Sequence, residues 1–281
     1  MLVRAMTSLE RYTPMLIQSK ASAITNYRAG AADRDALRRT TASVANASIK
    51  ECMANLTVHK PWGDERLLYT GSRSAIWLLN LKPGHMTSMH CHRRKTTTLI
   101  VINGTITFRT LTADQQRSTG SGVWIGTGVF HQSEAGSDGA TLLELETPVD
   151  KFDLVRLADA YGRQGTSYEG PENMQSSPLT TLQGTPIDGW HQQIGTACIS
   201  IYEPTKPHIV PAASDFNCVL EGAGIDIEGY VVMGPGDCLE VERIGRRVVF
   251  WRPGSLIATV STMPASSIDV FSCQGQAAKI A

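Results

Sequence analysis

The stretch Gly84-His85-Met86-Thr87-Ser88-Met89-His90-Cys91-His92 places two histidines two residues apart in a segment typical of a β-strand. Side chains alternate between the two faces of a strand, so His90 and His92 point to one face, about 7 Å apart. A third histidine, His131, ends a second glycine-punctuated stretch, residues 120–131. Imidazoles that share a face on neighbouring strands can converge on one divalent cation. The sequence therefore predicts a metal site formed by these three histidines.

The same residues resemble the two signatures of the cupin barrel. The matching positions are Gly84, His90, His92 and Gly104 for the first signature, and Gly120, Gly126, Gly128 and His131 for the second. The first signature usually carries a glutamate seven residues before its last glycine, and Thr97 stands at that position here. The resemblance implies a double-stranded β-helix that holds a metal through histidines. The usual fourth protein ligand is missing or comes from elsewhere in the chain.

Charge and cysteine usage narrow the class of protein. The chain has 281 residues with 26 Lys+Arg and 26 Asp+Glu, so its formal net charge is zero. This balance argues against a nucleic-acid partner or an anionic membrane surface. No apolar run approaches the roughly 18 residues of a transmembrane helix. The six cysteines are scattered without a C-x-x-C pair, which is typical of reduced thiols and predicts a cytoplasmic protein.

Residues 1–50 differ in composition from the rest of the chain. They are rich in Ala, Arg, Ser and Thr and contain only three acidic residues. Residues 33–45 are predicted to form a helix, with Asp33 or Asp35 near its N-terminus. We interpret this region as a helical extension that packs on the barrel or on a second subunit. A targeting peptide is the alternative, because such peptides are Arg-rich and poor in acidic residues.

Short apolar segments separated by glycine turns follow from residue 58. Ala75–Leu81 and residues 99–102 are two of these segments, and Asn103-Gly104 is a strong hairpin signal. Regularly spaced short strands indicate a double-sheet jelly roll. Residues 150–161 instead have apolar side chains at helical spacing, and we expect a helix there. Residues 165–186 are rich in Gly, Ser, Thr and Pro, which indicates a connection.

The second half of the chain resembles the first in outline. Residues 218–222 resemble the strand and turn around Gly104, and an ungapped alignment places His208 on His90 but Val210 on His92. One histidine cannot hold a metal, so we expect a degenerate barrel. The predicted fold is all-β, with tandem double-stranded β-helix (jelly-roll, cupin) barrels and an N-terminal helical extension. Its predicted parts are a helical extension over residues 1–50, a metal-binding barrel over 51–165 and a degenerate second barrel without a metal site over 166–281.

Two carboxylates are candidates for catalysis. Glu144 and Glu146 lie on one face of the predicted strand 140–147, and Leu143 and Leu145 lie on the other. If the glutamates face the interior, one could supply an oxygen ligand or act as a general base. If they face outward, both are solvated charges. The alternation permits either orientation.

Basic residues near the paired histidines are candidates for substrate binding. Arg93 and Lys95 follow His92 directly, and Arg109 lies on the return strand. A basic cluster at the mouth of a barrel suits a phosphate or carboxylate group of a substrate. The alternative is an exposed turn with solvated charges, as charge runs usually are.

A finer resemblance is to cupins of sugar metabolism, namely type II phosphomannose isomerases and capsule or lipopolysaccharide biosynthesis proteins. It rests on Lys60-Pro61-Trp62-Gly63, residues 99–104 and residues 146–156, and with the two signatures it spans residues 58–170. The resemblance implies isomerisation or epimerisation of a phosphorylated sugar or nucleotide sugar, and hence a small anionic sugar as substrate. The implied cofactor is a divalent metal, with zinc first and iron or manganese as alternatives.

Two other functions fit the same residues. Three-histidine iron dioxygenases also occur among cupins, and three neutral ligands leave up to three positions for substrate and oxygen. A non-catalytic sugar-binding or scaffolding bicupin belongs to another class. Because cupins often pair through their sheets and exposed strand edges need protection, we expect a homodimer.

Overall fold

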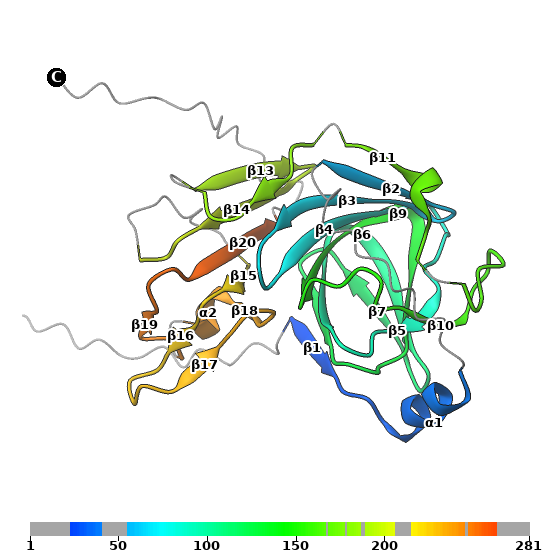
Figure 1. Cartoon of the computed structure of the whole chain (residues 1–281), viewed down its shortest axis with the longest axis horizontal. Coiled ribbons are helices and arrows are strands. Elements are labelled where there is room, and N and C mark those ends of the chain that lie inside the picture. Colours follow the sequence, from blue (N-terminus) through cyan, green and yellow to red (C-terminus); the bar gives the residue numbers. More distant parts are fainter. Residues whose placement is uncertain are drawn as a thin grey trace, which may run out of the picture.

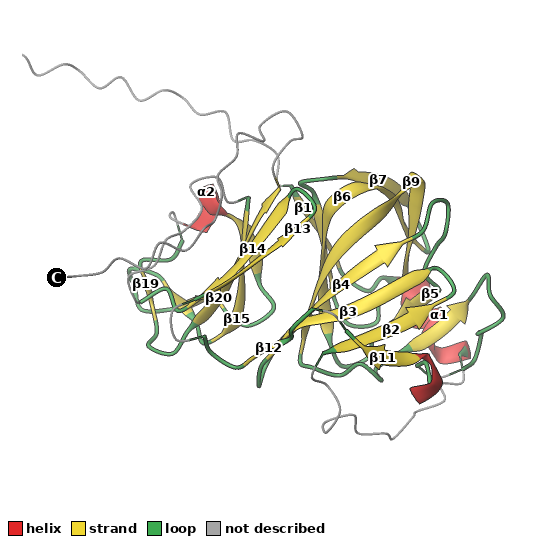
Figure 2. Ribbon diagram, turned by 90° about the horizontal axis from the view of Figure 1, so that it is seen from above, coloured by secondary structure: helices red, strands yellow, loops and turns green. Residues whose placement is uncertain are grey.

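The computed structural model describes residues 23–40, 55–166, 168–177, 179–186, 189–205, 215–244 and 247–262. Its regular structure is almost entirely β-strand, arranged in three sheets (Figures 1 and 2), which confirms the predicted all-β class. The helices are α1 (Ala31–Arg39), α2 (Val241–Ile244) and the 3-10 helix η1 (Pro171–Asn173). None of the described helices is long and apolar enough to cross a membrane.

The strands of the first sheet follow the order β1-β8-β6-β9-β4-β3-β2-β11. Off this path, β7 pairs with β6, β12 pairs with β3, and β5 pairs with both β9 and β10. The sheet curls around an interior, to the right in Figure 1. The strands are β1 (Ile24–Tyr27), β2 (Leu56–Lys60), β3 (Gly63–Thr70), β4 (Ala75–Leu81), β5 (Met89–Cys91), β6 (Thr96–Thr110), β7 (Asp114–Ser118), β8 (Gly122–Ile125), β9 (His131–Thr147), β10 (Val155–Ala158), β11 (Met174–Ser176) and β12 (Leu182–Gln183).

The remaining strands form two smaller sheets. One has the order β13-β14-β20-β15-β18, and the other has the order β17-β16-β19. Their bounds are β13 (Trp190–Ile194), β14 (Ala197–Tyr202), β15 (Phe216–Glu221), β16 (Gly224–Ile225), β17 (Val231–Met233), β18 (Cys238–Glu240), β19 (Phe250–Trp251) and β20 (Leu256–Thr262).

The strands at the centre of the first sheet are buried on both faces. On β4, Trp77 belongs to the hydrophobic cluster inside the barrel, while Ile76 belongs to a second cluster on the outer face. On β9, Leu142 lies inside, and Leu143 and Leu145 lie outside. Because side chains alternate along a strand, the even-numbered residues of this part of β9 face the barrel interior.

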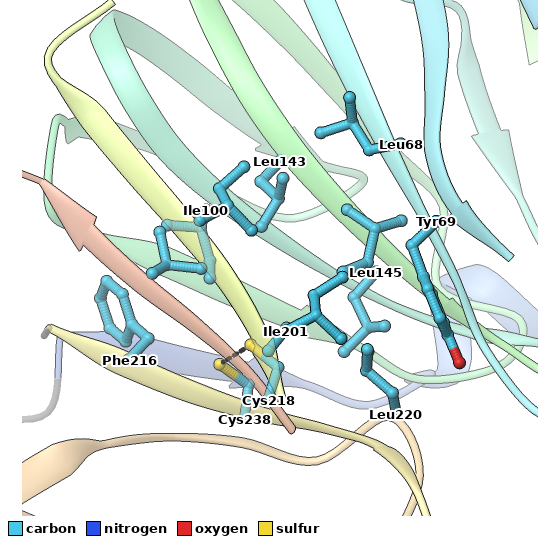
Figure 3. Packing of buried hydrophobic residues seen from close by; sticks show 14 of the residues in the cluster. Leu68, Tyr69, Ile100, Leu143, Leu145, Ile201, Phe216, Cys218, Leu220 and Cys238 are labelled. Atoms are coloured by element: carbon cyan, nitrogen blue, oxygen red, sulfur yellow. Dashed lines mark hydrogen bonds between the residues drawn. The ribbon is translucent and has the colours of Figure 1, made fainter. Parts of the chain in front are cut away.

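The five-stranded sheet covers the outer face of the barrel. Figure 3 shows Ile100, Leu143 and Leu145 of the first sheet packed against Ile201 and Phe216 of the second. Sheets that pack face to face bury one apolar face of each. This contact explains why the strands of the first barrel are apolar outside as well as inside.

The N-terminal elements contact both sheets. Strand β1 runs parallel to β8, and the backbone N–H of Ala23 donates to Glu240 Oε1 at the end of β18. Helix α1 begins after Gly30, whose N–H donates to the Asp33 carboxylate. Asp33 also accepts from the N–H of Phe130, the residue before β9. The helix thus begins slightly earlier than predicted and ends at Arg39; residues 41–50 lie outside the described residues.

The helix predicted over residues 150–161 is wrong. The structure has strand β10 there, antiparallel to β5, with Val155 opposite Cys91 and Arg156 opposite His90. Strand β5 has a single residue pair with β9. The backbone groups along its opposite edge also need hydrogen-bond partners. Pairing with β10 supplies them, and this long-range demand overrides the local helical spacing.

The connection predicted over residues 165–186 contains short strands. Strand β11 pairs with β2, and β12 pairs with β3, so both belong to the first sheet. The division into parts at residues 50 and 165 stays a prediction. His208 and Val210, which carried the comparison of the two halves, lie outside the described residues.

Gly63 is the glycine of the Lys-Pro-Trp-Gly segment, at the start of β3. Its φ is +150°, and a Cβ there would lie 1.8 Å from the carbonyl oxygen of Asn80 on β4. Backbone atoms on paired strands cannot move apart without breaking the ladder. This position therefore accepts only glycine.

We expect Gly63→Ala to lower the free energy of unfolding by about 3 kcal/mol, because the added methyl group forces the paired strands apart. Gly84→Ala is the matched control, since Gly84 has φ +67° and a Cβ added there would have no atom within 4 Å. The control should cost about 1 kcal/mol from backbone strain alone. Urea unfolding measures the free energy of unfolding of both variants. Equal losses of this free energy in the two variants would contradict the steric role given to Gly63.

Candidate metal centre

The structure brings the three predicted histidines together. His90 lies on β5 directly opposite His131, the first residue of β9, and His92 follows β5 on the same side as His90. The ring centroids of His90 and His131 are 4.3 Å apart, and those of His90 and His92 are 5.1 Å apart. One potential ligand atom of each ring lies within 4.8 Å of the others. We call this group the histidine cluster.

The hydrogen bonds of the histidine cluster determine which nitrogen faces a ligand. Each Nδ1 lies within hydrogen-bond distance of a backbone carbonyl oxygen. Because a carbonyl oxygen only accepts, each Nδ1 must carry the hydrogen, and each Nε2 keeps a free lone pair. All three rings are therefore held in the tautomer that binds a metal through Nε2. The accepting oxygens belong to Ser88 for His90, Asp153 for His92 and Val129 for His131.

Burial keeps the histidine cluster neutral. It lowers the pKa of His90 and His92 well below the usual histidine value, with positive neighbours adding to the effect. It lowers the pKa of His131 to about 4. Neutral imidazole is the form that ligates metals, and three such donors suit zinc and related divalent ions. The donor set thus fits a divalent cation.

No carboxylate joins the histidine cluster among the described residues. Thr97, at the position of the cupin glutamate, is buried, and its Oγ1 has no hydrogen-bond partner in the described part of the chain. Glu146 lies opposite Thr97 on β9, but both its oxygens are engaged. Oε1 accepts from Trp77 Nε1 at 3.1 Å, and Oε2 pairs with the ammonium of Lys95. The cluster therefore offers three neutral nitrogen donors.

A cavity of about 50 Å³ lies beside the histidine cluster, inside the barrel. This volume holds an ion and a few water molecules. Half of the side chains in its wall are charged. The lining residues are Lys60, Trp62, Glu65, Leu79, Thr87, Ser88, His90, His92, Lys95, Glu144, Lys151, Leu154, Arg156, Arg163, Tyr168 and Glu169.

Glu144 is the predicted catalytic carboxylate that faces this cavity. It shares the inward face of β9 with Leu142 and is only 8% exposed. Burial raises the pKa of Glu144, although the ammonium of Lys151, 3.6 Å from its Oε1, opposes the shift. The inward orientation left open by the sequence is therefore the one observed. Glu144 is a buried carboxylate with raised proton affinity that lines the same cavity as His90 and His92.

Lys151 connects Glu144 to a buried network of ions. Its ammonium lies 3.0 Å from Glu65 Oε2 and over the ring of Trp77. Burial lowers the pKa of Lys151, but Glu144 and Glu65 raise it more, so it stays charged. Tyr168 donates its hydroxyl hydrogen to Glu65 at 2.6 Å.

Lys60 and Glu169 extend the network across the cavity wall. The Lys60 ammonium pairs with Glu65 and Glu169 and lies 3.7 Å from the centre of the Tyr168 ring. Arg156 and Arg163 both pair with Glu169. Each of these cations thus has a carboxylate partner, as buried charges require. The lining residues include five cations and three carboxylates, and two further carboxylates outside the lining, Glu146 and Asp159, pair with Lys95 and Arg163.

The three basic residues predicted to bind substrate lie in three different places. Lys95 lines the cavity, with its ammonium paired to Glu146. Arg93 is exposed and lines a separate surface pocket. Arg109 pairs with Glu134 and Asp114 and lines neither the cavity nor the surface pocket. Their role in substrate binding stays a prediction.

Sequence reasoning missed most of the ion network. Lys60 lies in the Lys-Pro-Trp-Gly segment, and Lys151 and Arg156 lie in residues 146–156, so a signal existed without an assigned role. Glu65 and Glu169 carry no local signal, because a charged residue on a strand or loop is usually solvated. Only the tertiary fold places them in the interior.

Comparison with protein families supports the expected resemblance. Residues 47–159 match the family described as mannose-6-phosphate isomerase C-terminal. The match covers less than half of the chain. Over these residues, the predicted similarity to cupins of the phosphomannose isomerase type is confirmed. No curated protein matches the chain significantly.

Several solved structures are similar to part of the chain. KdgF from Halomonas sp. is 13% identical, over 32% of this chain and 83% of its own, with a TM-score of 0.31. A cupin-superfamily sugar phosphate isomerase from Silicibacter pomeroyi is 20% identical, over 30% of this chain and 60% of its own (TM-score 0.28). The capsular polysaccharide assembling protein CapF from Staphylococcus aureus is 18% identical, over 35% of this chain and 31% of its own (TM-score 0.30). The chain thus spans less than two thirds of the last two, and likeness at this level indicates no activity.

Asp153 connects the histidine cluster to the segment after β9. Its carboxylate accepts backbone N–H groups of Arg93, Arg94 and Lys95 at 2.9, 2.6 and 2.9 Å. Its carbonyl oxygen accepts the Nδ1 hydrogen of His92. The carboxylate therefore fixes the carbonyl that orients the ring.

We expect Asp153→Ala to weaken zinc binding 10- to 100-fold, the usual cost of losing a partner that orients a ligand. The reason is that residue 153 loses its anchor to the strand end that carries His92. Asp150→Ala is the control, because Asp150 lies in the same segment as Asp153 but pairs with the exposed side chain of Arg94. Competition with a chromogenic chelator measures the affinity, and circular dichroism verifies folding. A folded Asp153→Ala variant with unchanged zinc affinity would show that Asp153 does not position the ring.

Proposed function

We propose that the chain is a metal-dependent cupin that isomerises or epimerises a phosphorylated sugar or a nucleotide sugar. The observation that carries the proposal is the grouping of His90, His92 and His131, two of which (His90 and His92) line the same cavity as Glu144. The family match over residues 47–159 supports the substrate class. His90, His92 and His131 would hold the ion, with zinc as the first candidate and iron or manganese as alternatives.

Glu144 is the residue that moves the proton. In an aldose–ketose isomerisation a base takes the proton from the carbon beside the carbonyl and returns it to the neighbouring carbon. A carboxylate with raised pKa is a stronger base and a competent acid near neutral pH. Lys151, 3.6 Å away, holds the carboxylate in place and stabilises its charged form. Glu146 is the positioning residue of the pair, because Lys95 and Trp77 occupy both its oxygens.

A bound divalent ion would polarise the carbonyl and hydroxyl groups of the substrate, more strongly because three imidazoles leave its full charge of about +2. That charge is also the main attraction for an anionic substrate, because the cations of the wall have carboxylate partners. The alternating ammonium and carboxylate groups of the wall suit sugar hydroxyls, which both donate and accept hydrogen bonds.

The size of the cavity sets a condition on substrate entry. About 50 Å³ holds water molecules but not a sugar ring. Tyr168, Glu169 and Arg163 come from the segment after β10 and close one side of the cavity. We infer that this segment moves when the substrate enters, as lids over active sites commonly do.

We expect Glu144→Gln to lower the rate of hydrogen exchange at C2 of mannose 6-phosphate in deuterated water at least 100-fold, because the amide cannot accept the proton. Proton NMR of the zinc- or manganese-loaded protein measures the rate. Glu134→Gln is the control: Glu134 lies on the same strand, does not line the cavity and pairs with Arg109. Glu144→Gln should keep its metal. A rate equal to that of the parent protein would remove Glu144 from the reaction.

We expect His92→Ala to abolish metal binding in a folded protein, because only two donors remain. His85→Ala is the control, since His85 lies outside the cluster and its Nδ1 is bonded to Pro83 O. Elemental analysis of the purified variants gives the metal content. Full occupancy in His92→Ala would contradict the assignment of the site.

A three-histidine iron dioxygenase is the second candidate, favoured by the absence of a carboxylate from the histidine cluster among the described residues. Metal content separates the candidates. Bound iron with oxygen uptake supports the dioxygenase, and zinc or manganese with C2 exchange supports the isomerase. A protein that takes up no metal would instead be a sugar-binding or scaffolding bicupin.

We also propose a cytoplasmic location, a homodimer and a degenerate second barrel over residues 166–281. The described cysteines Cys91, Cys218 and Cys238 are free thiols, which is compatible with a reducing compartment. Size-exclusion chromatography with light scattering tests the dimer.

A further inference from the structure

Two of the free cysteines face each other across a pair of strands, far in sequence from the histidine cluster. Cys218 on β15 lies directly opposite Cys238 on β18 in the five-stranded sheet. Their Sγ atoms are 2.6 Å apart, and Figure 3 shows both side chains pointing to the same spot beside Ile201 and Phe216. Two thiols at this separation are closer than ordinary sulfur–sulfur contact.

The strand register explains this proximity. The N–H of Val219 donates to the carbonyl of Asp237, and the carbonyl of Val219 accepts from the N–H of Gly236, so Gly236 and Asp237 form a β-bulge that takes the place of a hydrogen-bonded pair opposite Val219. Such pairs alternate along an antiparallel ladder, which makes Cys218 and Cys238 a non-hydrogen-bonded pair. In such pairs the Cα atoms are about 4.5 Å apart and the side chains are closest. This separation lies within the range that a disulfide spans, about 4.4–6.8 Å.

The surroundings hold the two thiols in place but leave one way to reach them. Both belong to the apolar core between the sheets, with Cys218 1% and Cys238 7% exposed. Burial also raises the pKa of Cys238 well above the usual value, so the folded protein keeps it as a thiol. Strand β18, however, is a three-residue edge strand. Short edge strands open locally more readily than the core, and this opening exposes Cys238.

We propose that Cys218 and Cys238 are a thiol pair that converts to a disulfide by exchange with a low-molecular-weight disulfide such as oxidised glutathione. The Cys238 thiolate attacks one sulfur of oxidised glutathione, whose S–S bond breaks and releases one glutathione thiolate. The Cys218 thiolate then attacks Cys238 Sγ and releases the second glutathione. The two cysteines are oxidised by two electrons, oxidised glutathione is reduced to two thiols, and the two protons lost by the cysteines protonate them.

The new bond closes a loop between residues 218 and 238 and fixes the edge strand to β15. A bond within a loop of this length restricts the unfolded chain, so oxidation should raise the thermal midpoint. The edge strand also ends at Glu240, which binds the backbone of β1. Stabilising β18 therefore stabilises the contact between the two sheets.

The test incubates the full-length native protein with oxidised glutathione at pH 8 and then alkylates the remaining thiols under denaturing conditions. We expect the number of alkylated cysteines to fall by two, a peptide that joins residues 218 and 238, and a higher thermal midpoint that dithiothreitol reverses. Cys198→Ser, a neighbouring cysteine outside the pair, should give the same cross-link. Cys218→Ser and Cys238→Ser should each abolish it.

The proposal is overturned if the number of alkylated cysteines is unchanged at equilibrium, or if the cross-link joins other cysteines. It is also overturned if the bond forms only in denaturant, because the fold would then not bring the thiols together. A cross-link in both Cys218→Ser and the parent protein would count against it as well. None of these outcomes depends on the proposed enzymatic activity.

Discussion

Three hydrogen bonds from imidazole Nδ1 to backbone carbonyls decide what the interior of the barrel can do. They fix the tautomer of His90, His92 and His131 and leave the three Nε2 atoms free to bind a ligand. Two of the carbonyls are local, two residues before the histidine that they orient. The third belongs to Asp153, 61 residues after His92. The geometry of the histidine cluster therefore depends on how the segment after β9 docks on the end of β5.

That docking also builds the cavity. Asp153 holds three consecutive N–H groups after His92, and β10 pairs with the free edge of β5. The same segment brings Lys151 to Glu144 and Glu65. Removing one partner of a buried ion pair commonly costs about 3–5 kcal/mol. The network thus makes the position of Glu144 beside the histidine cluster depend on many contacts at once.

The fold and the histidine cluster were largely predictable from the sequence, and the cavity wall was not. The period of two in His90-x-His92 and the glycine spacings are local signals, and they predicted convergence that the structure shows. The orientation of Glu144 was open because β9 is buried on both faces, so alternation could not tell inside from outside. Residues 150–161 appeared helical because the spacing of their apolar side chains is a local signal. The need of the β5 edge for hydrogen-bond partners is not visible in the local sequence. Glu65 and Glu169 gave no signal, since their partners come from distant parts of the chain.

The most direct test of the metal centre is anomalous diffraction from crystals of the zinc-loaded protein, recorded above and below the zinc absorption edge. We predict one anomalous peak inside the barrel, bonded to the Nε2 atoms of His90, His92 and His131 at about 2.0–2.1 Å. The Nδ1 atoms should still bond to their backbone carbonyls. A peak bonded to Nδ1 atoms, or a zinc ion held elsewhere while the three rings point apart, would contradict the assignment of the metal centre.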